Sequence, residues 1–177
     1  MGFDEAAGNF QALNFSGQGL GNDRVAADVQ DGGGTSNANW SSQGNDGSTA
    51  RTQMYVFNGP NPDRDGTFDA DLVNHEFSHG LSIRLHRGRL NLQVQEGGMG
   101  EGWSDFFAMC LGAEEGDDFN GVYPMSGYAT LQMHLGFVHN YYFGIRRFPY
   151  STDMNKNPLT FADIDDGQIS FPTGVPR

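Results

Sequence analysis

The chain has 177 residues, a length that supports one domain with its own hydrophobic core. Its formal net charge is −12 at pH 7, so attraction to nucleic acid or to an anionic membrane surface is not expected. Solubility alone accounts for most of this acidity. No apolar run approaches the roughly 18 residues that span a bilayer, and the single cysteine, Cys110, cannot form a disulfide within the chain. Composition therefore favours a globular protein whose partners are neither nucleic acid nor membrane.

The first 66 residues are rich in Gly, Asn, Ser and Asp, which predicts short strands joined by turns. A short strand is predicted over residues 24–30, and residues 36–40 are predicted to be a short polar strand or an edge. The aromatic and aliphatic run at 53–59 ends in Asn-Gly and predicts the strongest strand, followed by a loop at 61–66. The N-terminus lacks the basic and apolar regions of a signal peptide.

From Thr67 onward the apolar residues follow helical spacing, which predicts a helix over 68–86. A second helix with a heavy apolar face is predicted over 101–112, and residues 131–145 are the candidate for a third. The whole chain, 1–177, is therefore read as one partial α+β domain. Its three parts are a β- and loop-rich part at 1–66, a part with the zinc-binding helices at 67–112, and a part with loops and a helix at 113–177. The end of the chain shows no closing element, so the domain is expected to continue beyond the C-terminus.

The first predicted helix carries the sequence VNHEFSHGLS. On a helix, residues four apart share a face, so His75 and His79 can direct their imidazoles at one Zn²⁺ ion. Glu76 lies one position further round, where a carboxylate can take a proton from water without binding the metal. The motif alone is not decisive, because two surface histidines on an ordinary helix give the same pattern.

A third metal ligand strengthens the zinc interpretation, because a catalytic zinc site uses three protein ligands and one open position. Glu101 lies 22 residues after His79, which leaves room for a second helix to cross beside the first. Asp105 shares a helix face with Glu101 and can accept the free N–H of a ligand histidine. The glycines around Glu101 are expected to allow close backbone approach near the metal. The alternative is that both acids are ordinary residues at a helix N-terminus, which the helix dipole favours.

Two motifs together, HEFSHGLSIRL and EGGMGEGWSDFFA, resemble the fungalysin family of secreted zinc metalloendopeptidases, which are thermolysin-like glutamate zincins. The resemblance covers nearly the whole chain. It extends to the segments GFDEAAGNFQ, NDRVAADVQDGGGTSNANW, MYVFNG and GIRRFPYSTDMNKNPLTFADI, in the same order. It implies a partial zincin-like catalytic domain, in which a β-rich part packs on the HExxH helix and a second, GEGWSD, helix.

The resemblance also implies roles for individual residues. His75, His79 and Glu101 would bind one zinc ion per chain, Glu76 would be the general base, and Asp105 would support a ligand histidine. A protein or peptide would be the substrate. Secretion and a propeptide that keeps the enzyme as a zymogen are also implied, whereas calcium has no support in the sequence.

Substrate contacts follow from two further similarities. The segment SNANW resembles the edge strand with which thermolysin-like enzymes bind a substrate backbone, which implies that Asn37 and the main chain of Ala38 pair with the peptide. The alternative is a surface turn. Arg147 lies where these enzymes place an arginine that holds a substrate carbonyl, and Arg146 competes equally for that role. A solvated or structural arginine is the remaining alternative.

The chain also departs from the family pattern. Thermolysin-like enzymes stabilise the oxyanion with a later histidine, which would lie beyond this C-terminus, since His134 and His139 come too early. The upstream signal peptide, propeptide and first β-rich part are absent, so an internal piece of the catalytic domain is expected. Three other interpretations stay open: a zinc-binding fragment without activity, a calcium- or carbohydrate-binding module built on loops such as 45–48 and 163–168, and an aminopeptidase.

Overall fold

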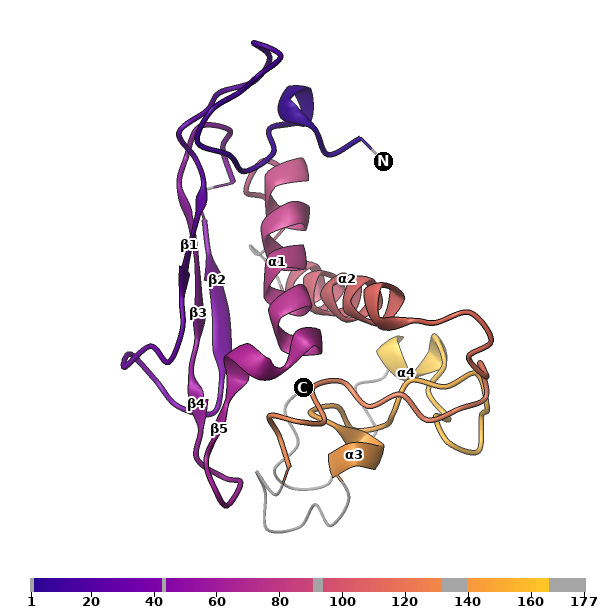
Figure 1. The fold of residues 1–177 in the computed structure, drawn as a ribbon. Helices are drawn as coiled ribbons and strands as arrows, with labels where there is room; N and C mark the ends of the chain where they lie inside the picture. Colours follow the sequence, from indigo (N-terminus) through magenta and orange to yellow (C-terminus); the bar gives the residue numbers. More distant parts are fainter. Residues whose placement is uncertain (1, 43, 91–93, 132–139, 166–177) are drawn as a thin grey trace.

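A three-stranded sheet forms one layer of the molecule (Figure 1). The computed structural model describes residues 2–42, 44–90, 94–131 and 140–165. The strand order is β1-β3-β2, from β1 (Val25–Asp28), β2 (Ala38–Ser41) and β3 (Ala50–Met54). β1 runs parallel to β3 and β2 runs antiparallel to it. Within the described residues, β2 is therefore an edge strand of this sheet.

The strand predicted over 53–59 is in fact divided between two sheets at Tyr55. Its N–H donates to the carbonyl of Asn37 beside β2, and its carbonyl accepts the N–H of Gly66. Beyond it, β4 (Val56–Phe57) pairs with β5 (Arg64–Asp65) in a two-stranded ribbon. The prediction of a loop over 61–66 was wrong for these last residues, because turn-forming composition does not show that a strand partner lies nearby.

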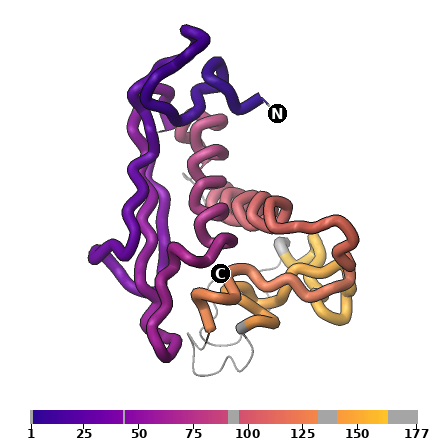
Figure 2. Tube along the Cα trace, viewed as in Figure 1, coloured from indigo at the N-terminus to yellow at the C-terminus, as the bar shows by residue number. Residues whose placement is uncertain are grey.

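Of the two long helices, α1 (Ala70–Leu85) lies beside the sheet and α2 (Val94–Gly112) packs against α1 (Figure 2). α1 falls within the range predicted for the first helix and follows the short helix η2 (Gly66–Phe68). α2 begins seven residues before the predicted start at 101, so the glycine-rich stretch before Glu101 is helical. Of the third predicted helix, residues 132–139 lie outside the described residues and 140–143 form α3 (Asn140–Phe143). The short helices η1 (Glu5–Ala7) and α4 (Ala162–Asp165) complete the list.

Close packing of α1 on the edge strand depends on Gly80. A Cβ atom at this position would lie 2.2 Å from Cζ2 of Trp40 on β2, so only glycine lets the helix approach so closely. Nearby, Phe57 and Leu72 are buried in a core cluster that joins the sheet to α1. Burying a side chain of this size contributes about 1.5–3 kcal/mol. This packing sets the position of β2 relative to the histidine-bearing face of α1.

Arg84 ties the N-terminal segment to the end of α1. Its guanidinium donates to the Asp23 carboxylate at 2.7 Å and to the carbonyls of Gly8 and Ser48 at 2.9 and 3.0 Å. Asp23 is fully buried and also accepts two backbone N–H groups. Because a buried charge is costly unless it is paired, this ion pair fixes one arrangement of the surrounding loops.

The loop-rich segment after α2 is anchored to the opposite end of α1. Asp69 caps the helix by accepting the N–H of Leu72 at 3.3 Å, and its second oxygen accepts the N–H of Ala129 at 2.8 Å. Asp71 accepts the N–H of Ser126 at 3.3 Å. The fold is thus a mixed α and β arrangement in which sheet, helix pair and loop segment meet around α1 (Figure 1). Among the helices of the described residues, none is long and apolar enough to cross a bilayer.

Candidate metal centre

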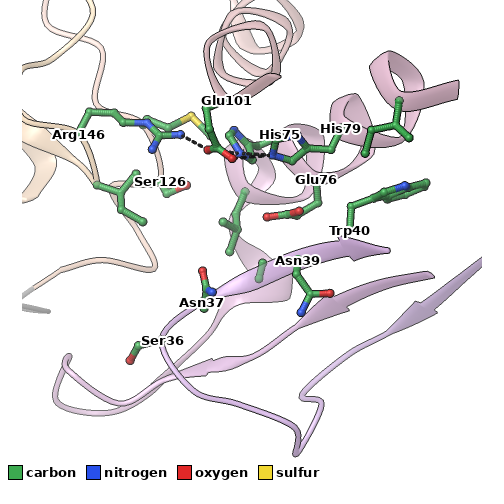
Figure 3. Close-up of a pocket in the computed structure, with 15 residues that line it drawn as sticks. Ser36, Asn37, Asn39, Trp40, His75, Glu76, His79, Glu101, Ser126 and Arg146 are labelled. Atoms are coloured by element: carbon green, nitrogen blue, oxygen red, sulfur yellow. Dashed lines mark hydrogen bonds and ion pairs between the residues drawn. The ribbon is translucent and has the colours of Figure 1, made fainter. Parts of the chain in front are cut away.

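Three side chains from the two long helices converge on one point (Figure 3). The Nε2 atoms of His75 and His79, on α1, lie 3.0 Å apart. One carboxylate oxygen of Glu101, on α2, lies 3.3 Å from Nε2 of His75, and the other lies 3.1 Å from Nε2 of His79. Helical spacing aligns the histidines, and the crossing of α1 and α2 brings in the carboxylate.

These distances fit a tetrahedral zinc ion. Bonds of about 2.0–2.2 Å at tetrahedral angles put neighbouring ligand atoms about 3.3–3.5 Å apart. The three observed separations of 3.0, 3.3 and 3.1 Å need only small adjustments to reach that range. Two imidazoles and one carboxylate also form a donor set that catalytic zinc sites use, with one position left open.

The members of the cluster attract one another electrostatically. Burial lowers the pKa of His75, but hydrogen bonds to Asp105 and Glu101 outweigh burial and raise this pKa to about 9. Burial raises the pKa of Glu101, yet hydrogen bonds from both histidines hold it well below its usual value.

Asp105 is the centre of a hydrogen-bond network behind the cluster. Its Oδ1 lies 2.7 Å from Nδ1 of His75, an arrangement that leaves Nε2 of that ring directed at the metal position. Arg146 donates to both oxygens of Asp105, at 2.5 and 2.6 Å, and the Tyr150 hydroxyl donates to Oδ2 at 2.6 Å. Burial and the Asp105 carboxylate raise the pKa of Tyr150, so its phenol remains a donor. Asp105 itself is almost fully buried.

The cluster opens into a pocket of about 520 Å³. Its walls are β2 with the two residues before it, the inner face of α1, Glu101, and loop residues 125–126 and 145–146. Glu76 lies in this wall and is 6% exposed, with its carboxylate between α1 and β2 (Figure 3). Burial raises the pKa of Glu76. A carboxylate in this position can exchange a proton with a water molecule or substrate in the pocket.

The edge of β2 presents main-chain groups beside this pocket. The Asn37 carbonyl accepts the N–H of Tyr55, while Ala38 lies opposite Met54. Antiparallel strands alternate hydrogen-bonded and non-hydrogen-bonded pairs, so the N–H and carbonyl of Ala38 and of Trp40 point away from β3. Both Asn37 and Ala38 line the pocket. This edge can accept an additional extended chain.

A family model described as the fungalysin metallopeptidase (M36) matches residues 1–174. The chain belongs to the fungalysin family. This confirms the resemblance that the two motifs indicated.

Curated relatives agree with this membership. The chain is 43% identical over 169 residues to "Extracellular metalloproteinase 10" of Coccidioides posadasii, and the match covers 93% of this chain and 25% of that protein. "Extracellular metalloproteinase mep" of Aspergillus fumigatus is 44% identical over 170 residues, with 93% and 25% covered. "Extracellular metalloproteinase MEP" of Pyricularia oryzae is 41% identical over 178 residues, with 98% and 26% covered. The chain thus spans about a quarter of the length of these relatives.

In this fungalysin chain the two neighbouring arginines occupy different surroundings. Arg146 lines the pocket and contacts Asp105, with its guanidinium also 3.4 Å from Glu101. Arg147, to which the sequence assigned the substrate contact, is not among the pocket-lining residues, and its guanidinium lies 5.3 Å from the ring centroid of Phe148. The structure thus brings the competing arginine, Arg146, to the metal centre.

Two other expectations about this fungalysin segment need correction. The glycines at 97, 98, 100 and 102 were expected to allow close backbone approach near the metal, but a Cβ at 97, 98 or 102 would meet no atom within 4 Å. The two acids were also alternatively read as residues of a helix N-terminus. Since α2 begins at Val94, Glu101 and Asp105 lie in its interior, and the dipole does not explain their position.

Tyr150 is the residue that sequence reasoning missed. It lies in the segment GIRRFPYSTD, whose similarity to the fungalysin family was recognised, but no periodic pattern there indicates which side chains point inward. Its only available signal was proximity in sequence to the two arginines. The hydrogen bond to Asp105 becomes evident from the fold alone.

Proposed function

We propose that the intact protein is a secreted zinc metalloendopeptidase with a thermolysin-like, zincin-type catalytic domain. The observation that carries this proposal is the spacing of 3.0–3.3 Å among the ligand atoms of His75, His79 and Glu101. These residues would hold one zinc ion. The family membership and the extracellular relatives support secretion and protein substrates. A propeptide that restrains the enzyme before its removal is also part of this proposal.

Proton transfer is assigned to Glu76. When bound, zinc supplies Lewis-acid chemistry that polarises the scissile carbonyl and makes water more acidic. The Glu76 carboxylate takes a proton from the attacking water and then delivers it to the leaving nitrogen. Its buried place in the pocket wall limits competing contacts with solvent.

Orientation of the site is assigned to the network around Asp105. Asp105 accepts the Nδ1 proton of His75, which fixes the ring so that Nε2 faces the metal position. It also holds Arg146 at the rim of the pocket, from where the guanidinium can donate to a substrate carbonyl. We therefore assign the carbonyl contact to Arg146 in place of Arg147.

The substrate is expected to bind as an extended strand along β2. The outward N–H and carbonyl of Ala38 would pair with the peptide main chain, and the Asn37 side chain would add a polar contact. Because main-chain hydrogen bonds are independent of side-chain identity, this mode suits internal peptide bonds in varied proteins.

The test is Glu76→Gln in the intact protein, assayed for zinc content and for casein hydrolysis. General acid–base catalysis typically contributes about 10²–10⁴-fold to the rate. The rate of casein hydrolysis should therefore fall about 100-fold or more, while the zinc content stays near one per chain. Glu115→Gln, in an exposed loop, is the matched control and should leave both quantities unchanged.

Two outcomes would overturn parts of this proposal. Hydrolysis by Glu76→Gln at the wild-type rate would remove Glu76 as the base. A wild-type protein that holds one zinc per chain but fails to cleave casein, with or without added metal, would instead establish a zinc-binding protein without peptidase activity. A chelator should abolish hydrolysis by the wild type, and added zinc should restore it.

A further inference from the structure

The loop between η1 and β1 carries a feature that the metal centre does not use. It contains Asn14-Phe15-Ser16, an N-x-S acceptor sequence for N-linked oligosaccharide. The same pattern occurs at Asn39-Trp40-Ser41, the last three residues of β2. The two sites have very different surroundings, so the structure can distinguish them.

Asn14 lies on a closed loop that extends into solvent. The N–H of Asn22 donates to the carbonyl of Ala12 at 2.9 Å, which closes the loop at its base. Between residues 12 and 20 every residue except Asn14 is exposed, and Asn14 is partly exposed. The indigo N-terminal segment, which contains this loop, projects past the end of the three-stranded sheet (Figure 2). A large hydrated substituent on this loop would keep its contact with water.

The acceptor residues are also held in a defined geometry. The Glu5 carboxylate accepts the N–H groups of Phe15 and Ser16, both at 2.6 Å, and the Ser16 hydroxyl. The Asn14 amide donates to the carbonyl of Gln18 at 2.5 Å. An N-linked sugar replaces one hydrogen of this amide, and the remaining N–H can still make that bond.

Three large apolar side chains lie on the same loop as Asn14: Leu13, Phe15 and Leu20 are 71%, 90% and 60% exposed. Exposed apolar groups on a secreted protein promote association. A carbohydrate attached at Asn14 would shield apolar surface of this loop, so the position of Asn14 gives the modification a physical benefit.

Asn39 has the opposite environment. Its amide donates to the Tyr55 hydroxyl at 2.6 Å, and its residue lines the pocket next to the metal centre. Its neighbours on β2 are packed, since Ala38 is buried and Trp40 lies against Gly80 of α1. Carbohydrate at this position would crowd the edge at which we expect a peptide to bind.

We propose that Asn14 carries an N-linked oligosaccharide in the secreted protein and that Asn39 does not. The inference rests on the proposed secretion through a eukaryotic pathway, which the extracellular relatives from fungi support. The donor is an oligosaccharide linked to a lipid diphosphate. The Asn14 nitrogen forms a bond to the anomeric carbon, the bond from that carbon to the diphosphate oxygen breaks, and the lipid diphosphate leaves while the amide loses one proton.

The experiment expresses the intact protein with a cleavable secretion signal in yeast. Purified protein is treated with a peptide amidase that removes N-glycans and converts each occupied Asn to Asp, and peptide mass spectrometry in heavy-oxygen water locates the conversion. Label is expected at position 14 and not at position 39. Occupancy is measured in the endoplasmic reticulum fraction as well as in the medium, so a failure of export still gives a result.

Matched variants separate modification from folding. Asn14→Gln and Ser16→Ala should each remove the glycan, whereas Ser16→Thr should retain it and Asn39→Gln should leave it unchanged. Casein hydrolysis by Asn14→Gln should equal that of the wild type, because this residue is outside the metal centre. An unmodified Asn14 in protein that cleaves casein would overturn this inference and leave the proposed function intact. A modified Asn39 would overturn the distinction between the two sites.

Discussion

Two parts of the molecule meet at the Asp105 carboxylate, and the residues of each part are positioned there in different ways. On one side, helical spacing aligns His75 with His79 on α1, and the crossing of α1 and α2 adds Glu101. On the other side, the loop-rich segment after α2 brings Arg146 and Tyr150 to the same carboxylate. Helix residues reach the site because of their period of 3.6, whereas the loop residues reach it because long-range contacts hold the loop.

The loop side depends on two carboxylates at the N-terminal end of α1. Asp69 and Asp71 accept the backbone N–H groups of Ala129 and Ser126, which fixes part of the pocket wall on the N-terminus of α1. Asp105 then holds the second part of the wall through Arg146. The metal ligands can therefore be set by two helices, while the substrate-binding wall requires carboxylates that link a loop to them.

Asp105→Ala should have the largest effect, because it disconnects both parts at once. It leaves the partly buried Arg146 without its main partner, and breaking a buried ion pair costs about 3–5 kcal/mol of unfolding free energy. Loss of the His75 contact should also weaken zinc binding about 10–100-fold. Urea unfolding and zinc competition with a chromogenic chelator measure these changes.

The control for Asp105→Ala is Asp28→Ala on β1. Asp28 also pairs with an arginine, Arg51, at 2.5 Å, but both side chains are nearly half exposed. A surface pair of this kind contributes about 0–1 kcal/mol. If both substitutions change stability equally, then Asp105 does not connect the two parts of the site.

The sequence predicted the helix side of this comparison and much less of the loop side. His75, His79, Glu101 and Asp105 were identified because pairs of residues four apart must share a helix face. The early start of α2 was not predicted, since glycine has low helix propensity and only packing against α1 overrides it. The choice between adjacent arginines could not be made, because no period in the loop specifies which side chain points inward.

The sheet shows the same limit. The strand signal at 53–59 was correct in its composition, but the division at Tyr55 depends on partners from Asn37 and Gly66. Neither partner is adjacent in sequence, and strand pairing is decided by such non-local contacts. The edge position of β2 was anticipated from the resemblance of SNANW to an edge strand, whereas the order β1-β3-β2 that creates this edge is not specified by local sequence.

Arg146→Lys should have an intermediate effect and decides between the two arginines. Lysine offers a single charged group in place of a planar fork, so one of the two bonds to Asp105 is lost. We expect a loss of about 2–3 kcal/mol in unfolding free energy, together with a raised KM for casein-derived peptides. Arg147→Lys is the matched control. A larger increase in KM for that control would return the carbonyl contact to Arg147.

Tyr150→Phe should have the smallest effect, because it removes one of four hydrogen bonds to Asp105 and leaves the carboxylate with three. A hydrogen bond to a charged acceptor contributes about 1.5–3 kcal/mol to the free energy of unfolding. Because the carboxylate keeps its other donors, we expect a loss of unfolding free energy near the lower limit. Zinc affinity should fall by about tenfold at most, since His75 keeps its own contact with Asp105. Tyr128→Phe, which preserves the ring beside Arg64, is the control and should change neither quantity. Should Tyr150→Phe weaken zinc binding as much as Asp105→Ala does, the loop side would contribute as much to holding the metal ligands as the helix pair.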